Sequence, residues 1–230
     1  LKAMRGGVVP DSRTPARTGD RKLADSAEAL QARLVEADAG VHMVREVRLP
    51  AAARHGHASL GGAALHPLLL PRLKGGHVLY VDTETTGLSG GTGILAFLIG
   101  VGRHDSNGFA VRQLLLPGPE HERAQLHAFR ELAEGAGAVV TYNGGSFDLP
   151  LLRNRFAMHG LSDPLAGVPH LDLLTLARRL WRSTLPDCTL GTVERSILGA
   201  RRGLEDVPGM EVPARYLAWL RSRDPWQLSG

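Results

Sequence analysis

Two carboxylates that stand two residues apart are the strongest chemical signal in this sequence of 230 residues. Asp82 and Glu84 end a short apolar run and lie in the order Asp-Thr-Glu-Thr-Thr-Gly. Side chains two apart on a strand share a face, so both carboxylates are expected to project together. Like charges this close repel, and a divalent cation between them would relieve the repulsion. Hard oxygen ligands favour Mg²⁺ or Mn²⁺, although an ordinary turn would also contain Asp and Thr.

A second acidic motif follows a later apolar run, in the order Tyr-Asn-Gly-Gly-Ser-Phe-Asp from Tyr142 to Asp148. The two glycines allow a tight reversal of the chain. Asp148 then falls in the first turn of a helix, where the helix dipole favours an anion. If the two strands are neighbours, Asp148 approaches Asp82 and Glu84. For Asp148 alone, helix capping is the simpler interpretation.

The elements that must position these acids are read from apolar runs and helical periodicity. Strands are predicted at 78–82, 93–102, 109–116, 138–142 and 168–171. Helices are predicted at 120–132, 146–159, 172–182, 189–198 and 212–222, with Ser146 as the cap of the second. The order predicts an α/β fold with a mixed five-stranded sheet, whose first three strands are antiparallel, flanked by helices.

The segment before residue 77 differs from the rest in its pattern of apolar residues. Residues 1–22 lack an apolar period, which predicts a flexible basic tail, and 23–76 are predicted to form an N-terminal helical extension. Its first helix would start near Leu23, include Leu34 at helical spacing and stop before Gly40. Three histidines, His55, His57 and His66, are interpreted as loop residues rather than metal ligands.

Charge and composition narrow the classes of protein. The net charge is +4, and residues 1–76 carry 12 basic and 7 acidic residues, an arm that could attract a polyanion but is equally typical of a solvated tail. The single cysteine, Cys188, excludes an intramolecular disulfide and a cysteine-based zinc cluster. The longest apolar run, 94–101, is far shorter than the roughly 20 residues of a membrane helix. We expect a cytoplasmic protein without membrane contact; its oligomeric state is left open.

The motifs resemble those of a known family. Residues 81–100, 141–152, 190–199 and 207–216 together resemble the DEDD-type 3′–5′ exonucleases of the ribonuclease-H-like superfamily, and most closely its YprB-like branch. The resemblance covers about residues 41–230. No single segment is specific, whereas the combination is. It implies a ribonuclease-H-like exonuclease domain over 77–230.

The resemblance also implies roles for individual residues. Asp82, Glu84 and Asp148 would be the catalytic residues and would ligate two Mg²⁺ or Mn²⁺ ions, which act together in phosphodiester hydrolysis. The expected substrate is the single-stranded end of RNA or DNA. The residues implied in binding the terminal nucleotide are Thr85, Thr86, Gly87, Asn143 and Phe147.

The family pattern also requires a fourth Asp on a late helix, preceded by Tyr or His. No such motif occurs in the sequence at the required place, and we expect it beyond Gly230. Asp172, at the end of the fifth predicted strand, could reach the site. We therefore expect a domain that is truncated at its C-terminus and lacks its last catalytic helix, with activity that depends on the missing residue.

Two other functions remain open. A non-catalytic nucleic-acid-binding or scaffold domain would explain the missing fourth acid and the basic front arm. A phosphatase with Asp82 as nucleophile is disfavoured, because such enzymes need a second Asp where this sequence has Glu84.

Overall fold

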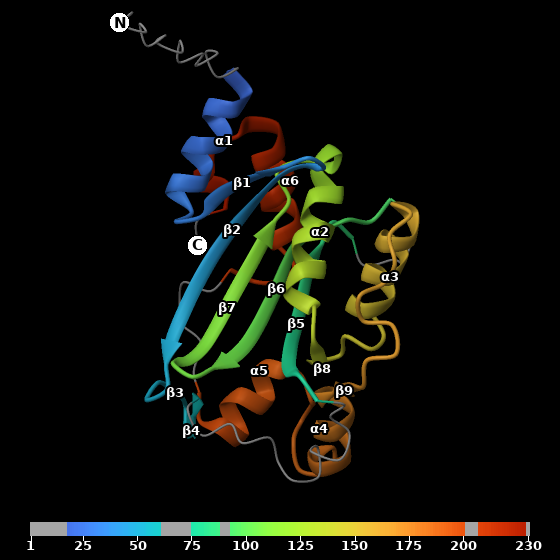
Figure 1. Ribbon diagram of the computed structural model, residues 1–230. Coiled ribbons are helices and arrows are strands. Elements are labelled where there is room, and N and C mark those ends of the chain that lie inside the picture. Colours follow the sequence, from blue (N-terminus) through green and yellow to red (C-terminus); the bar gives the residue numbers. More distant parts are fainter. Residues whose placement is uncertain (1–17, 61–74, 88–92, 201–206, 229–230) are drawn as a thin grey trace, which may run out of the picture.

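A mixed seven-stranded sheet forms the centre of the protein (Figure 1). The structure, a computed structural model, describes residues 18–60, 75–87, 93–200 and 207–228. The strand order is β1-β2-β7-β6-β5-β8-β9. The strands are β1 Arg33–Ala37, β2 Gly40–Pro50, β5 His77–Thr85, β6 Ala96–Asp105, β7 Gly108–Leu115, β8 Ala136–Thr141 and β9 His170–Asp172.

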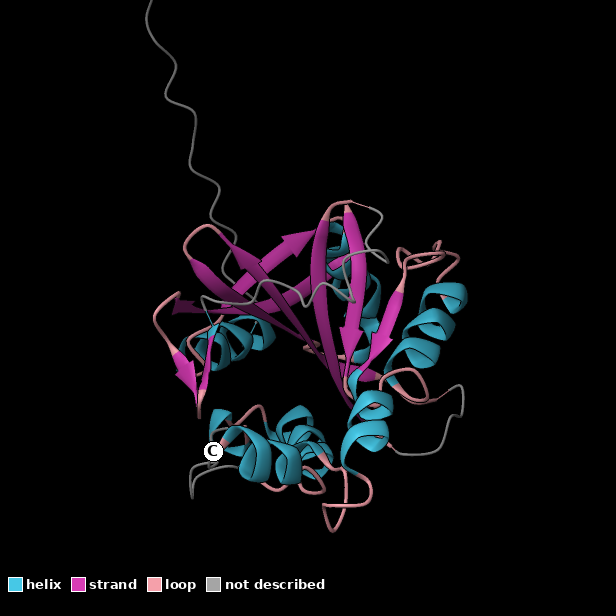
Figure 2. Ribbon diagram, turned by 90° about the horizontal axis from the view of Figure 1, so that it is seen from below, coloured by secondary structure: helices cyan, strands magenta, loops and turns pink. Residues whose placement is uncertain are grey.

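Strand direction changes in the middle of the sheet. β5, β6 and β7 form an antiparallel meander, as predicted. On its other side β5 pairs in parallel with β8, and β8 pairs in parallel with β9. The five predicted strands are therefore present, but the sheet has seven strands, because β1 and β2 extend it at the β7 edge. Figure 2 shows the twist of the strands relative to one another.

Six α-helices accompany the sheet within the described residues. They are α1 Thr18–Ala29, α2 Glu122–Ala133, α3 Asp148–Met158, α4 Leu173–Trp181, α5 Leu190–Val193 and α6 Val212–Ser222. α5 continues into a π-helical turn at Glu194–Leu198. The predicted cap of α3 is wrong: Phe147 holds the N-cap position and no side chain caps the helix. In the described part of the chain no helix is long and apolar enough to cross a membrane.

The prediction of a helical extension over 23–76 is wrong for much of that segment. α1 ends at Ala29, Leu34 lies in β1, and Gly40 begins β2 rather than ending a helix. The physical reason is tertiary: β2 pairs with β7 from Met43 to Pro50, and such backbone pairing overrides weak helical periodicity. α1 also begins within the segment expected to be flexible, whereas residues 1–17 and His66 lie outside the described residues.

Two hydrophobic clusters pack the helices against the sheet. α2 and α3 contribute Phe129 and Phe156 to one cluster. α1 and α6 contribute to the other, in which Trp219 is fully buried and donates its indole N–H to Ser26 Oγ at 3.1 Å. The Tyr216 ring stacks on Phe97 with centroids 4.1 Å apart. Side chains on α6 thereby hold both α1 and the sheet.

A buried ion pair links α2 to α3. Arg155 donates Nε to Glu122 Oε1 at 2.6 Å, and its Nη2 bonds the other carboxylate oxygen. The Glu122 and Arg155 side chains are only 3% and 7% exposed. His159 Nε2 lies 2.7 Å from Glu122 Oε2. Removal of one partner would leave a buried charge, so the pair fixes where α3 lies.

A small hairpin, β3 Arg54–His55 and β4 Ala58–Ser59, docks on the π-helical turn. The His57 N–H donates to Leu198 O at 2.6 Å, and His55 Nε2 lies 3.2 Å from Glu194 Oε1. A methyl group at Gly56 would lie 1.9 Å from Leu198 O, so only glycine permits this approach.

We predict that Trp219→Ala lowers the free energy of unfolding by about 3–5 kcal/mol, because it leaves a cavity and removes the hydrogen bond to Ser26 Oγ. Leu217→Ala on the same helix is the control, and its partly exposed side chain should cost about 1 kcal/mol or less. Urea denaturation measures both. Equal losses would show that α6 does not depend on the buried cluster.

Candidate active site

Asp82 and Glu84 lie where β5 leaves the sheet. The preceding residues Leu79 and Val81 are buried, with 0% and 4% exposure, and anchor the strand in the core. Asp82 is exposed and Glu84 is half-buried. The register with β6 shifts between Glu84 and Thr85, so regular pairing breaks down at these carboxylates. Polar side chains are thereby presented at the end of a rigid strand.

Asp148 begins α3, directly after the loop that follows β8. It is 8% exposed, which is unusual for a carboxylate. The Thr83 hydroxyl, on the strand between Asp82 and Glu84, donates to Asp148 Oδ1 at 2.5 Å. This bond ties the start of α3 to β5 and fixes one oxygen of the carboxylate.

The three predicted acids share one electrostatic neighbourhood. Burial raises the pKa of Glu84, and the charges of Asp82 and Asp148 raise it further. Burial also raises the pKa of Asp148, which the hydrogen bond from Thr83 partly offsets. A divalent cation would relieve both the burial and the repulsion, so these oxygen donors fit a hard metal ion. As they stand, no three His, Cys, Asp or Glu side chains among the described residues are grouped closely enough to enclose one.

Asp172 holds the loop that leads to Asp148. Its carboxylate accepts the backbone N–H groups of Asn143 at 2.8 Å and of Gly145 at 3.1 Å, and it caps α4 at Leu174. Asn143 adopts a φ of +69°, within the left-handed region. A methyl group at Gly144 would lie 2.6 Å from Thr141 Cβ. The reversal therefore depends on a glycine and on one buttressing carboxylate.

The predicted nucleotide-binding residues lie around the same strand ends. Thr85 donates its hydroxyl to Gly87 O at 2.8 Å, and Thr86 Oγ1 accepts the Leu95 N–H at 3.1 Å. Phe147 is 56% exposed, immediately before Asp148. Residues 88–92, expected to form a turn, lie outside the described residues. The binding roles of Thr85, Thr86, Gly87, Asn143 and Phe147 stay predictions.

Sequence reasoning missed two residues that organise this region. No local pattern distinguishes Thr83, which stands between the two expected ligands, because its partner Asp148 is 65 residues away. Asp172 was considered only as a ligand, whereas an Asp directly before a helix is a typical cap. Two other late acids have local partners: Asp163 pairs with Arg153, and Asp224 caps a short 3₁₀ helix.

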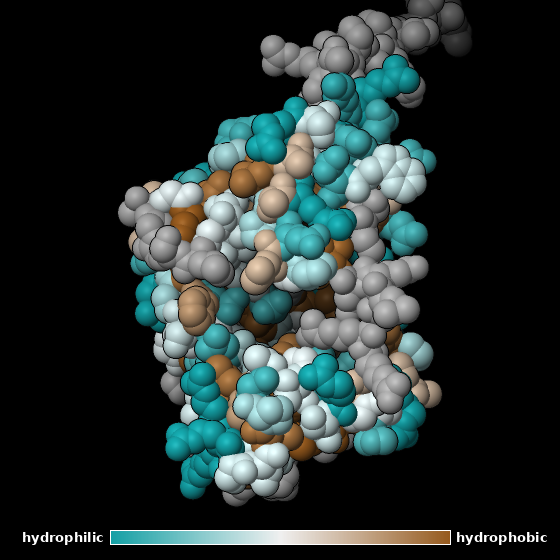
Figure 3. Space-filling view, turned by 180° about the vertical axis from the view of Figure 1, so that it is seen from behind, coloured by the Kyte–Doolittle hydropathy of each residue, from teal (hydrophilic) through white to brown (hydrophobic). Residues whose placement is uncertain are grey.

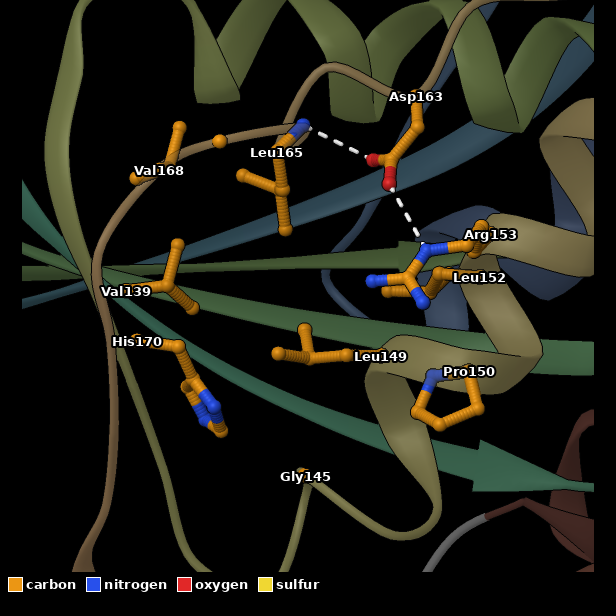
Figure 4. Close-up of a pocket in the computed structure, with 11 residues that line it drawn as sticks. Val139, Gly145, Leu149, Pro150, Leu152, Arg153, Asp163, Leu165, Val168 and His170 are labelled. Atoms are coloured by element: carbon orange, nitrogen blue, oxygen red, sulfur yellow. Dashed lines mark hydrogen bonds and ion pairs between the residues drawn. The ribbon is translucent and has the colours of Figure 1, made fainter.

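A pocket of about 200 Å³ lies beside the loop that precedes Asp148 (Figure 4). Leu149 and Val168 line its apolar part, His170 and Gly145 lie toward one end, and the Arg153–Asp163 pair lies toward the other. None of the three predicted acids lines it. The rear surface of the molecule is also hollowed near its centre, where hydrophobic side chains are visible at depth (Figure 3).

Comparison with known proteins decides the family. Residues 79–230 match the family model described as the RNase_H superfamily. The chain belongs to the RNase H superfamily. It is 36% identical over 202 residues to the uncharacterized protein YprB of Bacillus subtilis (strain 168). The aligned residues make up 82% of this chain and 48% of YprB. The predicted YprB-like, ribonuclease-H-like relationship is confirmed, and the chain spans about half the length of this relative.

Two solved structures are similar to part of the chain. The family B DNA polymerase of the hyperthermophilic archaeon Pyrobaculum calidifontis aligns with a TM-score of 0.50 and 19% identity, over 64% of this chain and 22% of the polymerase. Escherichia coli exonuclease I in complex with single-stranded DNA aligns with a TM-score of 0.44 and 18% identity, over 66% of this chain and 42% of the exonuclease.

We predict that Glu84→Gln raises the unfolding midpoint at pH 7 when a chelator is present. Since the pKa of Glu84 is raised in the folded state, its contribution to stability is present below its ordinary pKa of 4.5 and is lost as the pH rises. The gain should be of the order of a few degrees and should shrink as the pH falls toward 4.5. Thermal unfolding at several pH values measures it.

Glu36→Gln, at an exposed position on β1, is the matched control and should show no such gain. Mn²⁺ should then raise the midpoint of the unsubstituted protein more than that of Glu84→Gln. A Glu84→Gln midpoint at or below that of the unsubstituted protein at pH 7 would contradict the electrostatic account.

Proposed function

We propose that the protein is a divalent-metal-dependent nuclease that hydrolyses phosphodiester bonds of nucleic acid. The proposal rests on the position of the three acids at one end of the sheet, where β5 ends and where α3 begins after β8. The charges of Asp82, on β5, and of Asp148, at the start of α3, both raise the pKa of Glu84. Carboxylates with raised pKa values at a strand end are typical of functional sites rather than of ordinary turns. Membership of the RNase H superfamily supports the same reading.

In this proposal Asp82, Glu84 and Asp148 would hold two Mg²⁺ or Mn²⁺ ions. When bound, the ions would supply activation of water and charge stabilisation at the leaving oxygen. The chain supplies orientation: Thr83 fixes one oxygen of Asp148, and Asp172 fixes the loop before it. The low exposure of Asp148 keeps its carboxylate in a site of reduced dielectric, where charge interactions are stronger.

The proposed substrate is the 3′ end of a single strand of RNA or DNA, degraded in the 3′–5′ direction. The exposed ring of Phe147, next to Asp148, offers a face on which a base can stack. Such stacking tolerates every base, as an exonuclease needs. Thr85, Thr86, Gly87 and Asn143 would contact the same terminal nucleotide.

A non-catalytic nucleic-acid-binding domain is the second candidate. One observation favours it: within the described ranges no three acidic or histidine side chains are already grouped around a common point. It predicts binding that is sensitive to salt, without turnover in Mn²⁺.

We predict Mn²⁺- or Mg²⁺-dependent release of nucleotides from a 5′-labelled oligonucleotide, and its loss in Asp82→Asn. Loss of a metal ligand removes several kcal/mol of transition-state stabilisation, which corresponds to about 10²–10³-fold in rate. Asp105→Asn, an exposed acid that pairs with Arg48, is the control and should keep full activity. Denaturing gels of RNA and DNA strands measure the rates.

A strand blocked at its 3′ end separates the finer alternatives. An exonuclease leaves it intact, whereas internal cleavage would keep the nuclease and reject the exonuclease. Undiminished cleavage by Asp82→Asn would remove the proposed site. Binding of the strand with no cleavage in either metal would favour the second candidate.

A further inference from the structure

α4 presents a cluster of arginines to solvent. Arg178, Arg179 and Arg182 are exposed, whereas Leu174 and Ala177 on the other side of the helix are buried. The helix sequence, LLTLARRLW, contains no acidic residue. Over the described parts of the chain none of the three guanidinium groups has an ion-pair partner. This surface therefore carries positive charge that no ion pair among the described residues neutralises.

The start of α4 is attached to the candidate active site. Asp172, its N-cap, accepts the N–H groups of Asn143 and Gly145 in the loop before Asp148. Burial raises the pKa of Tyr142, at the start of that loop, and the charge of Arg178 opposes the rise. In Figure 1, α4 lies beside β9, beneath the body of the sheet. α4 thus begins at the candidate active site, and its exposed arginines lie farther along the helix.

We propose that Arg178, Arg179 and Arg182 bind the phosphates of a nucleic-acid strand whose end lies at the candidate active site. The inference rests on the proposed function, because it extends that substrate from a terminal nucleotide to a longer strand. At 1.5 Å per residue, Arg178 and Arg182 lie about 9 Å and 15 Å along the helix from Asp172. At about 3.4 Å per stacked nucleotide, these distances correspond to phosphates roughly three to four nucleotides beyond one that lies at Asp172.

The arginine cluster is expected to be more stable when it binds a phosphate backbone than when it is surrounded by water alone. Arg178 and Arg182 are four residues apart on a helix, where like charges destabilise each other. A polyanion would offset this repulsion and match the forked guanidinium donors. The helix dipole also favours cations near the C-terminus, which is a purely structural role. That role would affect thermal stability, whereas phosphate binding affects the salt dependence of affinity.

The test is the affinity of a fluorescent 12-nucleotide single strand, measured by anisotropy at several salt concentrations. Ca²⁺ replaces Mg²⁺, and gels confirm that the strand stays intact. The variant carries Arg178→Gln, Arg179→Gln and Arg182→Gln. We expect its Kd at about 0.1 M salt to rise at least tenfold. The slope of log affinity against log salt should become less steep by about 2, since each phosphate contact in a single strand contributes about 0.7.

The matched control removes three exposed arginines elsewhere, through Arg33→Gln, Arg103→Gln and Arg130→Gln. Arg33 lies on β1, at the sheet edge opposite β9. We expect little change in its salt slope. If both triple variants lose the same affinity and slope, the effect is general charge and the proposal is overturned. Unchanged binding by the α4 variant, or no binding by the unsubstituted protein, also overturns it.

The length of the nucleic-acid substrate separates this inference from the nuclease proposal. A dinucleotide is too short to reach α4, so the α4 variant should cleave it as the unsubstituted protein does, while its kcat/KM for the 12-nucleotide strand falls. Arginine-dependent binding without any cleavage would leave the α4 surface intact and remove the nuclease. Cleavage with equal loss on both lengths would leave the nuclease and remove the α4 surface.

Discussion

The parallel pairing of β5 with β8 is the constraint on which the candidate site depends. Val78 pairs with Ala138 and Tyr80 with Val140, so both strands leave the sheet at the same end. In open α/β sheets this is the edge at which ligands bind. The acids on β5 and the loop after β8 therefore lie at the same end of the sheet. The buried Glu122–Arg155 pair then keeps α3, and hence Asp148, in place against β5.

The ionised carboxylates of the candidate site destabilise the folded protein. Glu84 and Asp148 are carboxylates whose pKa values are raised chiefly by burial. A sequence selected for stability alone would place apolar or neutral residues there. The surrounding scaffold compensates through well-packed side chains such as Leu79, which is fully buried on β5. Local destabilisation at the end of a strand agrees with the proposal that these carboxylates hold a cation.

Much of the sheet could be predicted because local apolar runs in the sequence mark its central strands. The apolar run before Asp82 and the run that ends at Tyr142 identify β5 and β8 without knowledge of their partners. β2 could not be found this way, because Arg45, Glu46 and Arg48 interrupt its apolar pattern. Glu46 lies 2.7 Å from both Arg48 and Arg112, so these charges are satisfied by pairing on the surface between β2 and β7. Such partners are known only once the strands are placed.

The candidate acids were also readable from the sequence, whereas the groups that orient them were not. Asp82 and Glu84 stand two residues apart on one strand, and Asp148 comes three residues after a glycine pair. The roles of Thr83 and Asp172 arise from contacts across 65 and 29 residues of sequence, which no local pattern encodes.

The contact between the β3–β4 hairpin and the π-helical turn bears on synthesis of the chain. His55 and Glu194 are 139 residues apart. At about 5–20 residues per second, the hairpin leaves the ribosome roughly 7–28 s before its partner. A two-stranded hairpin is only marginally stable alone. This corner of the molecule therefore acquires its native form late, after most of the sheet has been translated.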